Sequence, residues 1–556
     1  MSPERAATLV LHSGKVVTLD TRSTVAEAVA IAGDRVLAAG SSDAMRRLAA
    51  PGAREIDLAG RTVIPGLIDA HAHLDREGLK DIFPSLAGCR SVEDVVARIA
   101  RLAKAARPGE WIVTMPLGDP PEYRGVPACY REGRVPDRRD LDRAAPDNPV
   151  YVRAIWGYWR DSPGPETLVS VANSRALAEA GISRDTKPPS PAVTIVKDAS
   201  GEPTGVFKER TYASVVELVL FAMMPRFTAE LRRAGLARAM RIYNSTGTTS
   251  VHEPHGVAPE VLEVWRAAHR AGALTVRAQL VHSPSWGGLD TTARIDAVRG
   301  FAGSAGDDWL RVGGLFIEIG RGADGAARAR AAPYTGWAGF HYDCGLPREE
   351  IAPVLIAAAR AGIQVSGLSG NFIPIYDEVA RASPIRGLRW IAQHLGVASR
   401  DEIATLKRHD IAVTPLSKRF IDKEGNAPGN RFGNPADETF FPLRSLLAAG
   451  VRVGLETDNV PTTLWAPIWH AIARRDRFGN EVTPASQKLT REQALRAATS
   501  GSASLMFREN ELGSLEPGKL ADLAVLSDDP LACAEDSIRA IVAETTIVGG
   551  RVVYER

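Results

Sequence analysis

The segment Val63-Ile-Pro-Gly-Leu-Ile-Asp-Ala-His-Ala-His-Leu74 decides the fold class of this chain. An apolar run leaves a Pro-Gly turn and ends in His71 and His73. Alternate residues of a strand share one face, so the two imidazoles can converge on a single cation. The alternative is a pair of unrelated core histidines, because His-x-His alone lacks the further ligands of a specific metal signature. Matching features far downstream favour the metal site.

Beyond this segment, apolar strands alternate with helical stretches as far as residue 507. Further strands are expected at 248–252, 274–281, 310–319, 363–366, 389–394, 411–415 and 451–458. This alternation predicts an α/β fold, a (β/α)8 TIM-like barrel over residues 65–507, with its active site at the carboxyl ends of the strands. A Pro- and Arg-rich insertion at about 90–225 interrupts the repeat after strand 1. We expect this insertion to form a lid or a pocket wall.

Both ends of the chain are rich in short strands. Apolar and polar residues alternate with period two between Gly and Asp turns, and Gly549-Gly550 suits a hairpin. Each end alone has too few strands to close a core. We therefore predict that residues 1–64 and 508–556 together form a small composite β-sandwich domain.

Composition places limits on the function. The 556 residues exceed a usual single core of ~250–300 residues, so a large domain with appended parts is expected. Lys and Arg total 68 against 66 for Asp and Glu, and the net charge of +2 argues against nucleic acid as a partner. The chain contains no run of ~18 uncharged apolar residues, so no membrane span is expected. The four cysteines show no paired spacing, and the N-terminus shows no apolar leader. Both features predict a cytoplasmic enzyme with reduced thiols.

Several motifs together resemble the metal-dependent amidohydrolase superfamily, in particular the branch that contains N-substituted formamide deformylases (amidohydrolase family 3). The motifs include Pro65 to His73, Leu141-Asp-Arg-Ala-Ala-Pro-Asp-Asn-Pro-Val150, Gly247-Thr-Thr-Ser-Val-His-Glu253, Glu456-Thr-Asp458 and Gly513-Ser-Leu-Glu-Pro-Gly-Lys-Leu-Ala-Asp522. They are spread over nearly the whole chain, and the last is specific to the composite β-domain of that family. The resemblance implies a metal centre at the mouth of the barrel.

The resemblance also implies a set of metal ligands. His71 and His73 match the strand-1 pair of the family, His394 matches its strand-6 histidine, and Asp458 matches its strand-8 aspartate. His394 is expected to be either a ligand or a stabiliser of the oxyanion, and Asp458 is the expected catalytic acid and base.

Two positions depart from the family pattern. Gly314 aligns with the strand-4 lysine, and the nearest candidate ligand is Glu318. The segment Gly367-Leu-Ser-Gly-Asn371 supplies no strand-5 histidine. Without a lysine that bridges two ions, we expect one metal ion per chain, zinc in the first instance, with Mn or Fe as alternatives.

The function implied is metal-assisted hydrolysis of an amide-type, non-peptide C–N bond, linear or cyclic, in a small organic molecule. Two alternatives stay open. One is the same fold with changed chemistry, such as C–C hydrolysis, hydration or decarboxylation, and the other is a metal-free binding protein. A homodimer is compatible with the sequence.

Five residues are candidates for substrate binding: His252, His341, Asn371, Lys418 and Trp156. His252 and His255 end strand 2, where a pocket role and loop packing are equal alternatives. Lys418 follows strand 7 and could bind a substrate carboxylate, although exposed basic residues usually face solvent. Trp156 of the insertion could line an apolar pocket or belong to the core.

Overall fold

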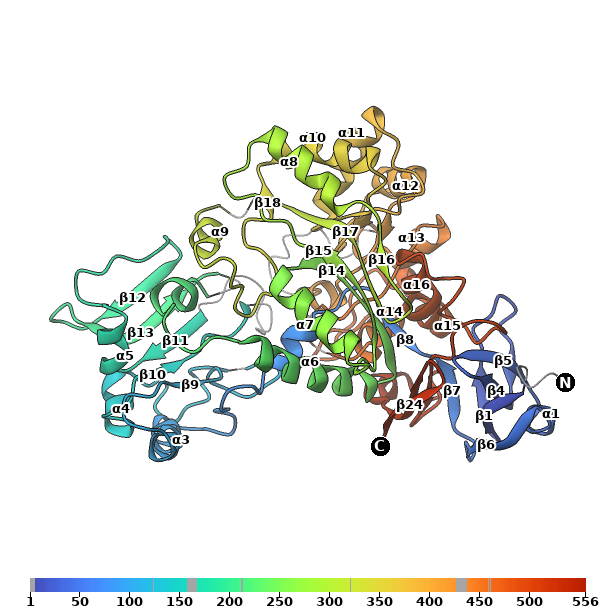
Figure 1. Cartoon of the computed structure of the whole chain (residues 1–556), viewed down its shortest axis with the longest axis horizontal. Helices are drawn as coiled ribbons and strands as arrows, with labels where there is room; N and C mark the ends of the chain where they lie inside the picture. Colours follow the sequence, from blue (N-terminus) through green and yellow to red (C-terminus); the bar gives the residue numbers. More distant parts are fainter. Residues whose placement is uncertain are drawn as a thin grey trace.

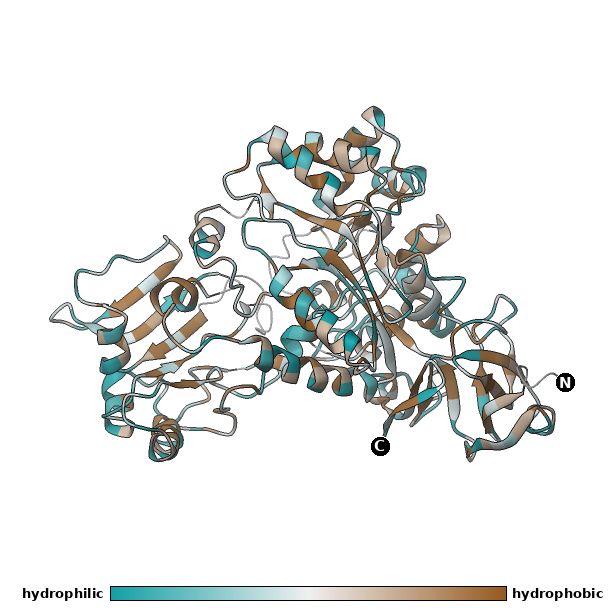
Figure 2. Cartoon of the chain, in the orientation of Figure 1, coloured by the Kyte–Doolittle hydropathy of each residue, from teal (hydrophilic) through white to brown (hydrophobic). Residues whose placement is uncertain are grey.

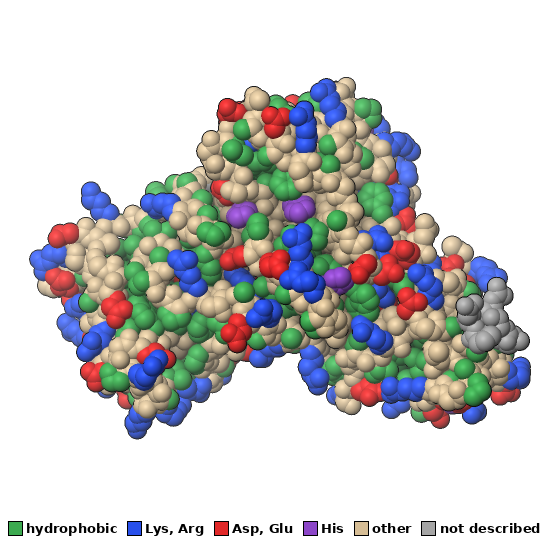
Figure 3. Space-filling model, in the orientation of Figure 1, with side chains coloured by type: hydrophobic (Ala, Val, Ile, Leu, Met, Phe, Trp, Pro, Cys, Tyr) green, Lys and Arg blue, Asp and Glu red, His purple; other side chains and the backbone are tan. Residues whose placement is uncertain are grey.

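The computed structural model describes residues 6–556 except 124, 158–167, 212–213, 321, 427–437, 459 and 461. Figure 1 shows a central α/β body, with a lobe formed by the insertion on the left and β-strands from both ends of the chain on the right. On the face drawn in Figure 3, acidic and basic side chains are interspersed, in keeping with the net charge of +2. Among the described residues, no helix has the length and apolar character needed to cross a bilayer.

The central body is built on a curled sheet of parallel strands. In spatial order these are β8 (Leu67–Asp69), β14 (Thr248–Val257), β15 (Arg277–His282), β17 (Leu310–Ile319), β19 (Val365–Gly367), β20 (Ile391–Ala392) and β21 (Ala412–Val413). They coincide with seven of the eight predicted strands and are mostly apolar (Figure 2), as expected for parallel strands buried on both faces.

The eighth predicted strand, 451–458, links the two edges of this sheet through isolated backbone contacts. Val453 bridges Val413 of β21, and Asp458 bridges Ala72 just beyond β8. Between these points, the Ala70 N–H donates to Leu455 O at 3.0 Å. The carboxyl ends of the first and last strands therefore lie side by side, which brings His71 and Asp458 together.

Helices follow the strands along the chain, as the alternation predicts. They are α6 (Ala229–Asn244), α7 (Pro259–Arg270), α8 (Thr291–Val298), α10 (Arg348–Arg360), α11 (Ile373–Ala382), α12 (Arg400–His409), α13 (Leu443–Ala448), α14 (Trp465–Ala473) and α15 (Arg491–Arg496). Residues at the N-termini of these helices favour helix initiation. Helix α12 has a capping box of Ser399 and Glu402, and α7 has Pro259 in its first turn. Trp390, Leu406 and Val413 lie in the core between α12 and the sheet.

The insertion forms a five-stranded sheet of its own. Its order is β12 (Val193–Lys197), β13 (Pro203–Glu209), β11 (Leu168–Ala172), β10 (Val150–Val152) and β9 (Ile112–Thr114), with α3 (Val92–Ala105), α4 (Arg138–Ala144) and α5 (Ser174–Glu179) packed on it. The buried residues of α3 are Val92, Val95, Val96 and Ile99, spaced as one face of a helix.

Strands from the two ends of the chain pair in one sheet. Its order is β24 (Arg551–Glu555), β23 (Ala543–Val548), β22 (Leu523–Leu526), β7 (Thr62–Pro65), β2 (Lys15–Val17) and β3 (Val25–Ala26). A second sheet contains β5 (Arg35–Gly40), β4 (Ala28–Ala32), β1 (Ala7–His12) and β6 (Ala49–Asp57). One apolar cluster includes Leu11 and Val63 from the first end and Leu523 and Ile547 from the other. The two ends therefore share a core.

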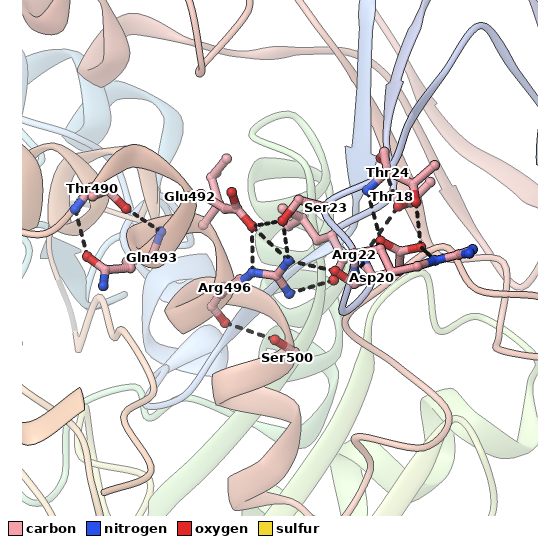
Figure 4. Close-up of polar contacts among 12 residues, drawn as sticks. Thr18, Asp20, Arg22, Ser23, Thr24, Thr490, Glu492, Gln493, Arg496 and Ser500 are labelled. Carbon is pink, nitrogen blue, oxygen red and sulfur yellow. Dashed lines mark hydrogen bonds and ion pairs between the residues drawn. The ribbon is translucent and has the colours of Figure 1, made fainter. Parts of the chain in front are cut away.

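A polar contact fastens an N-terminal turn to the central body. Figure 4 shows Arg496 of α15 reaching the turn at residues 19–24, where it donates to the carbonyls of Leu19 (2.8 Å) and Asp20 (2.6 Å). The Asp20 carboxylate accepts from the N–H groups of Arg22 and Thr24, which holds the turn closed.

Candidate active site

Two buried histidines follow directly after β8. The Ala72 N–H donates to His252 O (2.9 Å) and the Asp458 N–H donates to His71 O (2.8 Å). Residues 71–72 are therefore hydrogen-bonded to β14 on one side and to Asp458 on the other. Nε2 of His71 lies 3.1 Å from Nε2 of His73. Burial is the largest cause of the lowered pKa of both imidazoles. The neutral imidazole that results is the form that binds a metal ion.

Glu456 is a buried carboxylate that faces two of the histidines. Its Oε1 lies 2.8 Å from Nδ1 of His394, and its Oε2 lies 3.3 Å from Nδ1 of His71. Burial alone would raise the pKa of Glu456, but His394 and His71 together outweigh it and lower the pKa to about 2. Burial likewise opposes charge on His394, yet Glu456 raises the pKa of this imidazole. A carboxylate at Nδ1 leaves Nε2 available for a metal ion.

Glu253 has the corresponding position beside His73. One oxygen accepts from the Leu74 N–H at 2.8 Å, and the other lies 3.3 Å from Nδ1 of His73. A guanidinium nitrogen of Arg76 lies 2.8 Å from the same ring nitrogen. Burial, with a further contribution from Asp75, raises the pKa of Glu253 well above its usual value. The ring of His73 is thus positioned by the Glu253 carboxyl group and the Arg76 guanidinium.

Asp458 completes a group of three donor atoms. Its Oδ1 lies 3.1 Å from Nε2 of His73, and the donor atoms of His71, His73 and Asp458 all lie within 4.8 Å of one another. Those of His71, His255 and His394 form a second such group. Asp458 and His394 have φ angles of 59° and 49°. Positive φ is uncommon outside glycine and is concentrated at functional sites.

A cavity of about 340 Å³ opens above these groups. His73, His255, His394 and Asp458, which belong to the two donor groups, line one side of it. Its apolar wall contains Trp156, Phe340 and Leu368, and its cationic residues are Arg76, Arg210 and Arg328. Trp156, Arg210 and Thr211 come from the insertion, which agrees with the expectation of a pocket wall. The volume suits a small molecule.

The structure brings together four of the predicted metal-site residues: His71, His73, His394 and Asp458. Glu318 lies in the cavity wall, where the Cys344 thiol is 3.5 Å from its Oε1, and belongs to neither donor group. The expectation that Glu318 is a ligand therefore has no support in the geometry.

Of the predicted substrate contacts, Trp156 lines the cavity, with the Arg76 guanidinium 4.7 Å from the centre of its ring. The other four are not among the lining residues. His252 is buried beneath the site, His341 donates its N–H to Ser283, and Asn371 is exposed on the turn after β19. Lys418 forms ion pairs with Glu122 and Asp422, so its charge is already compensated.

The two departing positions are also resolved by the structure. Gly314 lines a different cavity with Gln364 and Met506, and Phe316, two residues further along β17, contacts the ring of His255. Gly314 lies ~7 Å further along β17 from the site than Phe316 does, so the structure does not place it beside the donor groups. At the end of β19, Phe372 and Tyr376 fill the space that a side chain on Gly367 would need.

Sequence reasoning did not assign Glu253 or Glu456 to the site, and it left His255 between a pocket role and loop packing. Glu456 was visible in the Glu456-Thr-Asp458 motif, and period two places its side chain on the same face as Asp458. Glu253 and His255 lie within β14, in which every residue is buried.

Comparison with known proteins identifies the family. Residues 54–554 match the model of the amidohydrolase family. The chain is 28% identical to N-substituted formamide deformylase from Arthrobacter pascens over 99% of this chain and 98% of that protein. It is 26% identical to LONG AFTER FAR-RED 3 from Arabidopsis thaliana over 99% and 92% of the two chains.

Solved structures show the same fold at lower identity. A metal-dependent hydrolase from Pyrococcus furiosus is 22% identical, with a TM-score of 0.67 over 94% of this chain and 100% of that one. A zinc-bound adenosine deaminase from Xanthomonas campestris is 15% identical, with a TM-score of 0.51 over 100% and 94%. The chain belongs to the amidohydrolase family. It is a hydrolase of the type that acts on carbon–nitrogen bonds, and its His/Asp cluster could hold a metal ion.

Proposed function

We propose that this enzyme hydrolyses an amide-type C–N bond, linear or cyclic and not in a peptide, in a small organic substrate with the aid of one divalent metal ion. The observation that carries the proposal is the convergence of His71 Nε2, His73 Nε2 and Asp458 Oδ1 on one point at the floor of the cavity. Zinc fits this set of nitrogen and oxygen donors, and manganese or iron are alternatives.

The donor set fits a metal ion in two further respects. The Glu456 carboxylate lies at Nδ1 of His71, as carboxylates commonly do behind metal-bound histidines. The lowered pKa values keep both rings neutral near pH 7. Both donor groups include His71, which supports one ion per chain rather than two.

The mechanism divides between the ion and the side chains. When bound, the cation supplies a water molecule of lowered pKa and polarises the scissile carbonyl. Asp458 accepts a proton from water at the cavity floor and returns it to the leaving nitrogen. His394, held by Glu456 in a form that favours the proton, donates a hydrogen bond to the carbonyl oxygen as negative charge develops there.

The cavity suggests which substrates to test first. Trp156, Phe340 and Leu368 offer an apolar surface beside the donor groups, which suits an aromatic or aliphatic substituent on the amide. The relative from Arthrobacter pascens makes N-substituted formamides the starting compounds. Product identification, of amine and acid, separates amide hydrolysis from the changed chemistry considered above.

For the architecture, we propose that the curled sheet with residues 451–458 is a closed (β/α)8 barrel. The bridges at Val453 and Asp458 support this. We also propose that residues 1–64 and 508–556 form one composite β-sandwich domain, supported by the pairing of Val63 with Val525.

The metal proposal is tested by elemental analysis of the purified protein together with the double variant His71→Ala/His73→Ala. We expect about one divalent ion per chain in the wild type. The double variant should bind none and lose activity, with its circular dichroism retained. Two ions at full occupancy would contradict the single-ion site, and a wild type that is active without metal would contradict the mechanism.

A further inference from the structure

Strand β14 changes its register close to the cavity. Glu253 lies opposite Leu280 of β15, and Val257 lies opposite His282, so β14 uses four steps where β15 uses two. Extra residues of this kind kink a strand and redirect its side chains, and they are common beside active sites. His255 lies inside this irregular stretch.

The backbone around His255 is fixed on both sides. The side-chain amide of Gln393 donates to Pro254 O at 2.9 Å. Gly256 has a φ of 81°, and a Cβ there would lie 2.9 Å from Phe316 Cβ and from the backbone of Ser283. Only glycine fits that position, so the direction of His255 is built into the chain.

The ring of His255 is also restrained. It is stacked on Phe316 and on Phe340, with centroid distances of 4.4 and 4.6 Å. The residue is only 5% exposed, yet it is part of the cavity lining. Stacking and burial limit the rotamers available to the ring, which lowers the entropy lost when it binds a ligand.

His255 lies among the other histidines of the site. Its centroid is 5.3 Å from that of His73 and 5.8 Å from that of His71. One of its ring nitrogens lies within 4.8 Å of donor atoms of both His71 and His394. In contrast, among the described residues the segment that follows β19 contributes Leu368 to the cavity lining, and leucine has no donor atom.

We infer that His255 is a protein ligand of the metal ion, which it reaches together with His71, the residue common to both donor groups. The inference rests on the proposed metal-dependent function. In this arrangement the imidazole comes from the irregular end of the second strand of the sheet, and the fifth strand supplies none. His394 keeps its place beside the substrate carbonyl.

The test compares His255→Phe with the matched variant His282→Phe. Phenylalanine at 255 keeps an aromatic ring on Phe316 and Phe340 but removes both nitrogens. His282 ends the neighbouring strand β15 and belongs to neither donor group. The centroid of its ring is 5.1 Å from that of Phe301. Zinc affinity is measured by competition with a chromophoric chelator, and the ligand field by the visible absorption of the Co²⁺-loaded protein.

Loss of a residue that only orients a ligand costs roughly 10–100-fold in metal affinity. We therefore expect His255→Phe to lower zinc affinity by at least ~10–100-fold and to change the Co²⁺ spectrum. His282→Phe should leave both the affinity and the spectrum unchanged. If His255→Phe does not fold, as judged by circular dichroism, His255→Gln is measured by the same criteria.

The outcomes separate the two proposals. A wild type that binds no metal overturns the proposed function and this inference with it. A wild type that binds one ion, together with a His255→Phe protein that binds it as tightly and with the same Co²⁺ spectrum, overturns the inference alone, even if activity falls.

Discussion

Asp458 combines two roles at the scale of the single residue, and substitution can separate them. Asp458→Asn keeps the size and one oxygen ligand but removes the carboxylate that carries the proton. We expect the metal content to remain and kcat to fall by ~10²–10⁴-fold, the usual contribution of general acid–base catalysis. The measurement is kcat at saturating metal on an amide that the wild type hydrolyses, with metal content determined on the same sample. Activity within a few-fold of wild type would remove Asp458 from the proton transfer.

Single residues also show what could be predicted from sequence. His71, His73, His394 and Asp458 were expected in one site because they match the ligand positions of the family that the sequence resembles. His255 could not be distinguished from His252, because every residue of β14 is buried and no apolar-polar alternation marks its inward face. The register change that turns His255 towards the cavity depends on the pairing with β15, which local sequence does not encode.

At the scale of elements, helix α2 (Leu74–Leu79) directly follows His73, its N-cap residue, and packs on α6 at Gly78 and Gly235. A Cβ on Gly78 would lie 1.8 Å from Gly235 O, a backbone atom that no rotamer change can move away. Alanine favours a helix by ~1 kcal/mol over glycine, but overpacking costs ~1–3 kcal/mol or more. We expect Gly78→Ala to lower the Tm and weaken metal binding, because α2 holds the segment that carries His73.

Gly235→Ala is the matched control for this contact. Its Cβ would meet the nearest atom, Gly78 C, at 3.1 Å, a distance that a small shift can relieve. Its loss of Tm in thermal unfolding should therefore be smaller. Equal Tm values for Gly78→Ala and the wild type would show that the two helices are not in this close contact.

Elements were predicted well where they are apolar and long, and less well where pairing alone defines them. Strand β17 has its expected bounds, β15 overlaps its expected range of 274–281, and β14 begins at Thr248 as expected but continues to Val257 instead of ending at 252. The expected strand at 451–458 has only bridges at Val453 and Asp458, and β20 and β21 are two residues each. Near the mouth of a curled sheet, side-chain hydrogen bonds such as that from Thr457 to Asp69 replace regular pairing.

At the scale of the whole molecule, the last ~45 residues are joined to both the N-terminal strands and the central body. β22 pairs with β7, and the Arg277 guanidinium of β15 contacts the Asp522 carboxylate at 2.7 and 3.0 Å, both side chains being 4% exposed. Truncation after Glu509 would expose one face of the cluster that contains Leu11 and Val63. It would also leave a buried Arg277 charge without its partner, which typically costs ~3–5 kcal/mol.

We therefore expect a protein truncated after Glu509 to aggregate, as measured by size-exclusion chromatography and by binding of a hydrophobic dye. The control ends at Gly550 and lacks only β24, an edge strand whose residues are half-buried or exposed. Since β22, β23 and the contact between Arg277 and Asp522 remain, this shorter truncation should stay soluble and keep its metal. If the Glu509 truncation were soluble and fully active, the two ends of the chain would not depend on each other, and the composite domain would have to be abandoned.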